Sequence, residues 1–172
     1  MIRQITVAIL TISDRSAAGS YEDQSGPVIE EIVTTQLEAQ VEQKAVIPDE
    51  IDLIKTTLLQ WVEQDQVDLI LTTGGTGFAP RDVTPEATRL VIEKETPGLV
   101  FAMFKDSLAV TPHAMLSRMV AGIRARTLII NLPGSPKAAR ENLTTILPAL
   151  PHAVELLRDD PLANKHHEVD QD

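Results

Sequence analysis

A short apolar run that passes directly into a glycine-rich turn places the strongest limit on the fold. Residues 67–71 are apolar apart from one aspartate and are bounded by turn residues, which predicts a buried central strand. Residues 72–77 read Thr-Thr-Gly-Gly-Thr-Gly, and glycine lets the backbone turn tightly and approach a ligand closely. Thr84 before Pro85 predicts a helix start, with threonine as the N-cap and proline first in the helix. The sequence thus predicts a unit of strand, glycine turn and helix.

The same alternation of strand and helix runs along the whole chain. Further strands are predicted over residues 5–12, 41–47 and 127–131, and the second of these is less apolar and belongs near a sheet edge. One predicted helix begins at Ser25. Four more are predicted over residues 50–64, 84–94, 99–108 and 137–157, and the last of these is interrupted near Pro148. Residues 114–130 admit either a helix or a strand over 117–123 followed by a turn at 124–126. Such alternation predicts an α/β fold whose mostly parallel sheet is covered by helices on both faces.

Composition narrows the class of protein. The 172 residues suit one domain, which we expect over residues 1–158, followed by a flexible acidic tail over 159–172. The absence of cysteine excludes disulfides, thiolate metal sites and a cysteine nucleophile, and it is compatible with the cytoplasmic location that we expect. The net charge of −10 argues against nucleic acid or an anionic membrane as the main partner. No apolar run is long enough to span a bilayer.

Several polar segments should meet at one edge of the predicted sheet. Ligands in such folds bind outside the carboxyl ends of the strands. Loops beginning at Ser13, Thr73 and Leu132 leave strands at that edge, and Asp49 follows another strand in the same way. Successive N–H groups in the glycine turn can form a nest for phosphate. We therefore expect a phosphate-binding crevice, and the alternative is that the glycines only relieve strain in a strand-to-helix turn.

A phosphate ligand would meet the repulsive field of an acidic protein. Helix N-termini, loop amides, a divalent cation or a few placed cations must offset that field locally. The candidate cations are Arg15, Arg81, Arg118 and Lys137.

Other familiar sites are missing from the sequence. The P-loop pattern does not occur, and Pro80 stands where a dinucleotide-binding fingerprint needs its third glycine. The Gly-x-Ser-x-Gly elbow of hydrolases is also absent. The four histidines, His113, His152, His166 and His167, show no metal-binding spacing.

Two motifs resemble the signature of the molybdopterin adenylyltransferase family, which includes bacterial single-domain enzymes and the G domain of gephyrin. The first joins residues 72–77 to Pro-Arg-Asp-Val-Thr-Pro-Glu at 80–86, and the second is Asn-Leu-Pro-Gly-Ser-Pro at 131–136. Shorter family-like motifs stand at residues 12–15, 48–50, 116–118 and 121–122, in the family's order. The resemblance covers residues 5–158, nearly the whole chain.

The resemblance implies a three-layer α/β/α sandwich of the molybdopterin-binding-domain type and a defined reaction. The terminal phosphate of molybdopterin attacks the α-phosphorus of ATP in the presence of Mg²⁺, giving adenylyl-molybdopterin and pyrophosphate. The family also implies a homotrimer and a downstream molybdate-inserting enzyme that receives the product. Molybdopterin and ATP are therefore the expected partners in a step of molybdenum cofactor biosynthesis.

The resemblance also assigns roles to residues. Asp49 and Asp82 match the family's acidic positions and are expected to act in catalysis and to hold Mg²⁺. For Asp49 the alternative role is that of N-cap for the helix that follows it. Asp82 has no such alternative, because Thr84 is the predicted N-cap of the helix after it. Expected nucleotide-binding residues are Gly74, Gly75, Thr76, Gly77, Pro133, Gly134 and Ser135. Expected substrate-binding residues are Ser13, Ser117 and Arg118. The simpler alternative is helix capping for Ser135 and a local turn hydrogen bond for Ser13 and Ser117.

Two other functions stay open at this point. The chain could be a non-catalytic relative that binds molybdopterin or serves as a scaffold. It could also be a related domain that acts on a different nucleotide-containing substrate. Retention of both aspartates and both glycine motifs favours the enzyme.

Overall fold

The computed structural model describes residues 4–159 as a six-stranded sheet with helices on both faces. The strands are β1 (Thr6–Ile12), β2 (Gln40–Ile47), β3 (Leu69–Thr73), β4 (Lys94–Glu95), β5 (Ala121–Arg124) and β6 (Thr127–Leu132). The helices are α1 (Asp14–Ala17), α2 (Ser25–Thr35), α3 (Ile51–Glu63), α4 (Thr84–Arg89), α5 (Pro97–Val110), α6 (Pro136–Ile146) and α7 (Leu150–Leu157). Two 3-10 helices, η1 (Pro112–Leu116) and η2 (Leu147–Ala149), complete the elements of the described chain.

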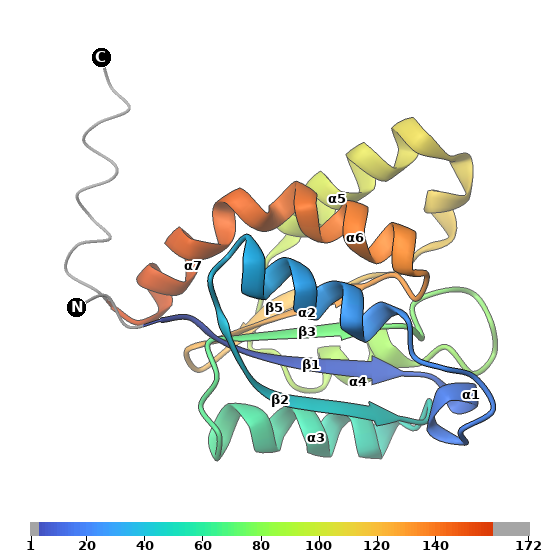
Figure 1. Cartoon of the computed structure of the whole chain (residues 1–172), viewed down its shortest axis with the longest axis horizontal. Coiled ribbons are helices and arrows are strands. Elements are labelled where there is room, and N and C mark those ends of the chain that lie inside the picture. Colours follow the sequence, from blue (N-terminus) through green and yellow to red (C-terminus); the bar gives the residue numbers. More distant parts are fainter. Residues whose placement is uncertain (1–3, 160–172) are drawn as a thin grey trace.

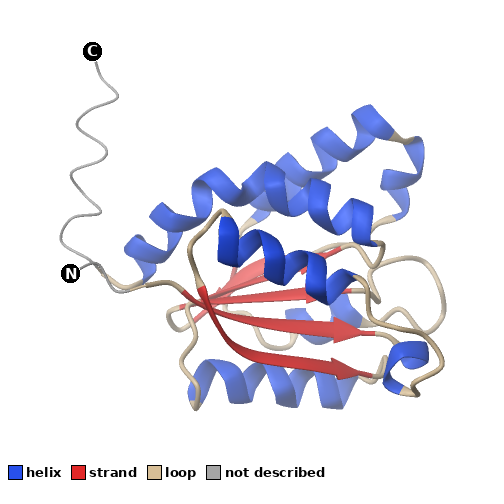
Figure 2. Ribbon diagram, viewed as in Figure 1, coloured by secondary structure: helices blue, strands red, loops and turns tan. Residues whose placement is uncertain are grey.

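The sheet has the order β2-β1-β3-β6-β5-β4 and is mostly parallel. The neighbours β2, β1, β3 and β6 pair in parallel, whereas β5 pairs antiparallel with β6 and with β4. Figures 1 and 2 show α2, α5, α6 and α7 over one face and α3 on the other, where the core residues of α4 also pack. The predicted three-layer α/β/α sandwich is therefore confirmed.

Alternating side chains of the central strands build two separate cores. Val7 and Ile9 of β1 pack in the core beneath α2 and α6, while Ala8 and Leu10 pack in the core beneath α3 and α4. Side chains in a strand point alternately to opposite faces, so an apolar run with no polar break is buried on both sides. By contrast β2 alternates between exposed and half-buried residues and lies at the sheet edge, as predicted.

The central strand extends further than its apolar residues indicate. It is predicted over residues 67–71, but β3 begins two residues later, at Leu69, and ends with Thr72 and Thr73, both buried. Their hydroxyls are satisfied inside the fold: Thr72 Oγ1 accepts from Asn131 Nδ2 at 2.9 Å, and Thr73 Oγ1 donates to Pro133 O at 2.7 Å. Buried hydroxyls that find hydrogen-bond partners can occupy a strand that faces two cores.

The chain after α4 also differs from the sequence prediction. The helix expected to reach residue 94 ends at Arg89, because residues 93–96 turn to pair with β5. The ambiguous segment resolves into η1 and β5, with the predicted turn at residues 124–126 confirmed by a left-handed Ala125 at φ 51°. The final helix is interrupted at η2, as expected near Pro148.

Apart from Asp159, the expected acidic tail lies outside the described residues. Within residues 4–159, no helix combines the length and the apolar character needed to cross a membrane.

Candidate functional site

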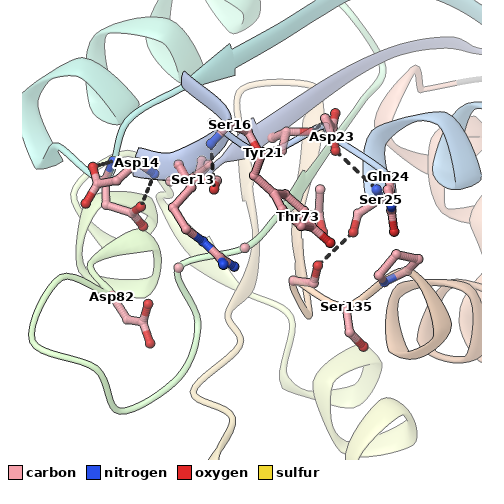
Figure 3. Close-up of a pocket in the computed structure, with 18 of the residues that line it drawn as sticks. Ser13, Asp14, Ser16, Tyr21, Asp23, Gln24, Ser25, Thr73, Asp82 and Ser135 are labelled. Carbon is pink, nitrogen blue, oxygen red and sulfur yellow. Dashed lines mark hydrogen bonds between the residues drawn. The ribbon is translucent and has the colours of Figure 1, made fainter. Parts of the chain in front are cut away.

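The carboxyl ends of β1, β2, β3 and β6 surround a pocket of about 610 Å³, which we call the main pocket. Figure 3 shows Asp82 on one side of it and Asp23, Ser25 and Ser135 on the other. Seven of the predicted site residues line it together: Ser13, Asp49, Gly74, Gly75, Asp82, Gly134 and Ser135. The prediction that separate loops converge at this edge is confirmed.

Asp49 is held in place from two directions. Its Oδ2 accepts from the amide of Asp14 at 2.9 Å, and its own amide donates to Asp14 Oδ1 at 3.0 Å. The residue is only 8% exposed, and its Oδ1 has no hydrogen-bond partner among the described residues. The N-cap alternative is wrong, because α3 has Glu50 as its N-cap and no side-chain capping bond. A buried carboxylate oxygen without a partner is costly unless a ligand engages it.

The surroundings of Asp49 make its ionised form less favourable. Burial raises the pKa of this carboxyl above its ordinary value; the hydrogen bond from the Asp14 amide opposes the rise, and the carboxylates of Asp14 and Asp82 add to it. The two predicted catalytic carboxylates, Asp49 and Asp82, both line the main pocket. A cation between them would relieve both the burial cost and the repulsion.

Asp82 lies on the glycine loop, residues 74–83, which joins β3 to α4. Its Oδ2 accepts from the amide of Ala79 at 3.0 Å, so the carboxylate also shapes the loop. The predicted capping role of Thr84 is wrong: Val83 is the N-cap, and Thr84 Oγ1 instead donates to the carbonyl of Gly74 at 2.9 Å. Thr84 therefore closes the base of the loop.

Two glycines of this loop are required by close contacts. Gly74 has φ +95°, and a Cβ there would lie 2.2 Å from the carbonyl oxygen of Ile12. Gly75 has φ +64°, and a Cβ there would lie 2.3 Å from Thr84 Oγ1 and 2.7 Å from Asp49 Oδ1. Besides allowing the turn, Gly75 thus leaves room beside the unpartnered oxygen of Asp49. The amide of Gly74 already donates to Leu132 O at 3.3 Å, which removes one donor from the predicted nest.

Arginine side chains fix the glycine loop from two sides. Arg81 forms a bidentate pair with Asp14, at 2.9 Å for both bonds, and also donates to Glu50 at 3.0 Å. Arg118 donates to the carbonyl oxygens of Gly77 at 2.8 Å and Asp82 at 2.7 Å, and it pairs with Glu86. Arg118 is not among the residues that line the main pocket.

Five predicted site residues lie outside the main pocket: Thr76, Gly77, Ser117, Arg118 and Pro133. Ser117 and Pro133 line a second cavity of about 200 Å³, which also has Met119, Ala138 and Asn142 in its wall. The Ser117 hydroxyl is buried there without a hydrogen-bond partner among the described residues. Residues 134–136 line the main pocket, so the chain passes from the second cavity at Pro133 directly to the main pocket.

Two of the serines predicted to bind ligands, Ser13 and Ser135, also make local helix-capping hydrogen bonds. Ser135 is the N-cap of α6, as the alternative proposed, and its Oγ accepts from Ala138 N at 3.2 Å. Ser13 caps the short helix α1, and its Oγ accepts from Ser16 N at 3.3 Å. Both residues nevertheless line the main pocket, so capping and ligand binding are compatible.

Sequence reasoning missed most of the wall formed by the loop after β1. Asp14, Tyr21, Asp23 and Ser25 all line the main pocket. Asp23 accepts from Thr11 Oγ1 at 2.7 Å and from two amides at the start of α2, and Ser25 Oγ donates to Gly134 O at 2.7 Å. The polar run directly after a buried strand was the sequence feature that could have indicated these residues. The hydrogen-bond partners of Asp23 and Ser25 could not be predicted from that run.

The residues of the main pocket fit a magnesium ion. Within residues 4–159, no group of three or more His, Cys, Asp or Glu side chains could hold a metal on its own. Mg²⁺ is commonly bound by one or two carboxylates, with water and phosphate oxygens completing the shell. Asp49, with its unpartnered Oδ1, and Asp82 in the wall of the same pocket are the two carboxylates that would hold it.

Comparison with known proteins places this architecture among molybdenum cofactor proteins. The family MoCF_biosynth, described as "Probable molybdopterin binding domain", matches residues 8–152. Gephyrin of Dictyostelium discoideum is 51% identical over 90% of this chain, although the chain spans only 23% of that protein's length. The molybdopterin adenylyltransferase of Helicobacter pylori strain J99 is 45% identical over 91% of this chain and 89% of its own length. The solved structure of the molybdopterin biosynthesis enzyme MoaB from Thermus thermophilus superimposes with a TM-score of 0.86 at 48% identity, covering 92% of this chain and 99% of its own.

Proposed function

This chain belongs to the molybdopterin binding domain family, and from that premise we propose that it is a molybdopterin adenylyltransferase of molybdenum cofactor biosynthesis. An oxygen of the terminal phosphate of molybdopterin forms a bond to the α-phosphorus of ATP. The bond from that phosphorus to the bridging oxygen breaks, and pyrophosphate leaves. The products are adenylyl-molybdopterin and pyrophosphate.

One observation carries this proposal beyond family membership. Asp49 is buried with an unpartnered oxygen, beside a glycine that leaves the space open, in the wall of the pocket that Asp82 also lines. Transfer of a nucleotidyl group depends on positioning and charge neutralisation more than on covalent help from the protein. Asp49 and Asp82 would hold Mg²⁺, which when bound supplies positive charge to phosphate oxygens.

The remaining residues of the main pocket position the reacting phosphates. Gly75 and Gly134 present backbone without side chains at the pocket wall, so phosphate oxygens can approach closely. Helix α6 starts at the pocket with Ser135 and Pro136, and a helix N-terminus favours anions. Thr76 and Gly77 support the loop from outside the pocket. In this proposal Ser117 contacts molybdopterin and Pro133 contacts the nucleotide, both from the second cavity, and Arg118 acts through the glycine loop.

Further parts of the proposal come from the resemblance rather than from contacts in this chain. A homotrimer, a cytoplasmic location and a downstream molybdate-inserting enzyme are properties that we expect of this protein as a member of the family. Each is open to measurement on the purified protein, beginning with its molar mass in solution.

Incubation of the protein with Mg²⁺, ATP and molybdopterin tests the proposal. We expect pyrophosphate and adenylyl-molybdopterin to form in equal amounts. Binding of molybdopterin without either product would instead support a non-catalytic scaffold. Failure to bind molybdopterin would indicate a different nucleotide-containing substrate.

A further inference from the structure

The main pocket poses an electrostatic problem for any phosphate ligand. Its wall contains four carboxylates, those of Asp14, Asp23, Asp49 and Asp82, in a chain of net charge −10. A magnesium ion offsets part of this charge, but the substrates of the proposed reaction carry several phosphate groups. A side-chain cation that faces the pocket and is free to engage phosphate would therefore add to the attraction from the helix N-terminus and the loop amides.

Three of the four candidate cations are already committed to carboxylates. Arg81 pairs with Asp14 and Glu50, and Arg118 pairs with Glu86. Lys137 lies 3.7 Å from the carboxylate of its helical neighbour Glu141. None of these three lines the main pocket.

Arg15 is the exception. It lines the main pocket, and its guanidinium carbon lies 4.8 Å from the centroid of the Tyr21 ring. Within residues 4–159, no carboxylate lies within ion-pair distance of its guanidinium. Stacking on an aromatic face restrains the guanidinium plane and leaves its N–H edge available to a ligand.

The nearby carboxylates are hydrogen-bonded to other groups, which leaves the Arg15 guanidinium without a carboxylate partner among the described residues. Asp14, the residue before Arg15, accepts from Arg81 and from the amide of Asp49. Asp23 accepts from Thr11 and from two amides at the start of α2. Because each carboxylate is satisfied elsewhere, neither neutralises Arg15.

We propose that Arg15 is the side-chain cation that binds a phosphate group of the substrates, and that the Tyr21 ring holds its guanidinium in place. Figure 3 shows Tyr21 at the pocket wall between Ser13 and Thr73. The inference rests on the proposed function and names a binding residue within that same pocket. The ligand chemistry is a phosphate group, which either ATP or molybdopterin could supply.

Binding measurements on single variants test the role of Arg15. Arg15→Gln removes the cation, Arg15→Lys keeps the charge without the planar fork, and Arg126→Gln is the matched control. Arg126 is exposed and precedes β6, whereas the pocket lies beyond the opposite end of that strand. Calorimetric titration with Mg²⁺ and ATP forms one arm, and titration with molybdopterin forms the other.

We expect Arg15→Gln to weaken binding of one of these probes by about ten- to a hundredfold, as for a lost charge-assisted hydrogen bond. Arg15→Lys should fall between wild type and Arg15→Gln, and Arg126→Gln should bind like wild type. The probe that loses affinity identifies which phosphate Arg15 contacts.

Variants of Tyr21 test the stacking part of the inference. Tyr21→Phe keeps the ring and should bind like wild type. Tyr21→Leu removes the aromatic face and should weaken binding of the same probe by roughly two- to fivefold, the size of an exposed cation–π contact. Equal binding by Tyr21→Phe and Tyr21→Leu would remove Tyr21 from the proposal.

The outcomes separate this inference from the proposed function. If wild type binds both probes and Arg15→Gln binds them as tightly as Arg126→Gln does, Arg15 has no role in phosphate binding. If wild type binds neither probe, the proposed function itself fails. Unchanged melting temperatures of the variants establish that any loss is local.

Discussion

Asp14 and Asp49 each donate a backbone amide hydrogen to the other's carboxylate, at 2.9 and 3.0 Å. This reciprocal pair ties the carboxyl end of β1 to that of β2 and orients the Asp49 side chain. Its Oδ2 is used in that contact, and its Oδ1 is left without a partner beside Gly75. The scaffold therefore fixes one oxygen of the carboxylate and keeps the other available.

The space next to that oxygen should be essential for turnover. Gly75→Ala would place a methyl group 2.7 Å from Asp49 Oδ1, so we expect the turnover number to fall by about tenfold or more. Gly19→Ala is the control, because Gly19 has a similar φ of +74° but nothing within 4 Å of its added Cβ. Gly19→Ala should lose about 1–2 kcal/mol of stability through its left-handed backbone alone. Gly75→Ala should lose more, because its methyl group would also lie 2.3 Å from Thr84 Oγ1, and only Gly75→Ala should lose activity. Equal activities would show that the crowding at Asp49 is harmless.

Asp49 should reduce the stability of the metal-free protein at neutral pH. Burial raises the pKa of Asp49 in the folded state above its pKa in the unfolded state. The free energy of unfolding therefore falls as the pH rises from the unfolded-state pKa to the folded-state pKa. Asp49→Asn removes the charge and should raise the melting temperature at neutral pH when no divalent cation is present. The gain in melting temperature should disappear below about pH 3, where the carboxyl of Asp49 is protonated and as neutral as the amide that replaces it. Thermal unfolding across pH measures the difference, and a lower melting temperature for Asp49→Asn at neutral pH would contradict it.

Arg118 should govern the position of Asp82 rather than the binding of ATP. It holds the carbonyl oxygens of Gly77 and Asp82 but does not line the main pocket. We expect Arg118→Gln to lower turnover by about 10- to 100-fold while leaving ATP affinity near that of wild type. Arg140→Gln, which breaks an exposed pair with Glu31, is the matched control and should change neither quantity. A large loss of ATP affinity with normal turnover would reverse the assignment.

The opposite end of the sheet carries a buried ion pair that should stabilise the fold. Burial alone would raise the pKa of Asp68, but hydrogen bonds from Arg158 and Thr6 outweigh it and leave this pKa below its ordinary value. The stabilisation is therefore present above the unfolded pKa and lost as pH falls through the folded one. Asp68→Asn should lower the unfolding free energy at neutral pH by about 3 kcal/mol, with exposed Asp65→Asn as the control.

Denaturant unfolding of Asp68→Asn and wild type at neutral and acid pH measures this difference. It should shrink as the pH falls, while pyrophosphate release at neutral pH stays normal. A constant difference at all pH values would show that the carboxylate charge is not its source.

Features encoded by neighbouring residues were predicted well. The central strand, the glycine turn after it and the Ser135 cap of α6 follow from local patterns, and the structure has all three. The convergence of loops at one edge follows from the parallel sheet, which the alternation of elements indicated.

Features that depend on partners distant in sequence were not predictable. Arg81 pairs with Asp14, 67 residues away, and Arg118 holds the carbonyl of Asp82, 36 residues away. Thr84 offered a good N-cap locally, but the carbonyl of Gly74 took its hydroxyl once the glycine loop closed. No local pattern states which of several acceptors a side chain meets after folding.

The most direct test of the central claim is a double-mutant cycle on pyrophosphate release. Rates with saturating Mg²⁺, ATP and molybdopterin would be measured for wild type, Asp49→Asn, Asp82→Asn and the double variant. If both carboxylates serve one ion, each single change should slow release by about a hundredfold or more, and the double variant should be little slower than the weaker single one. A folded Asp82→Asn protein that turns over at a near-normal rate, or two losses that multiply, would contradict the account.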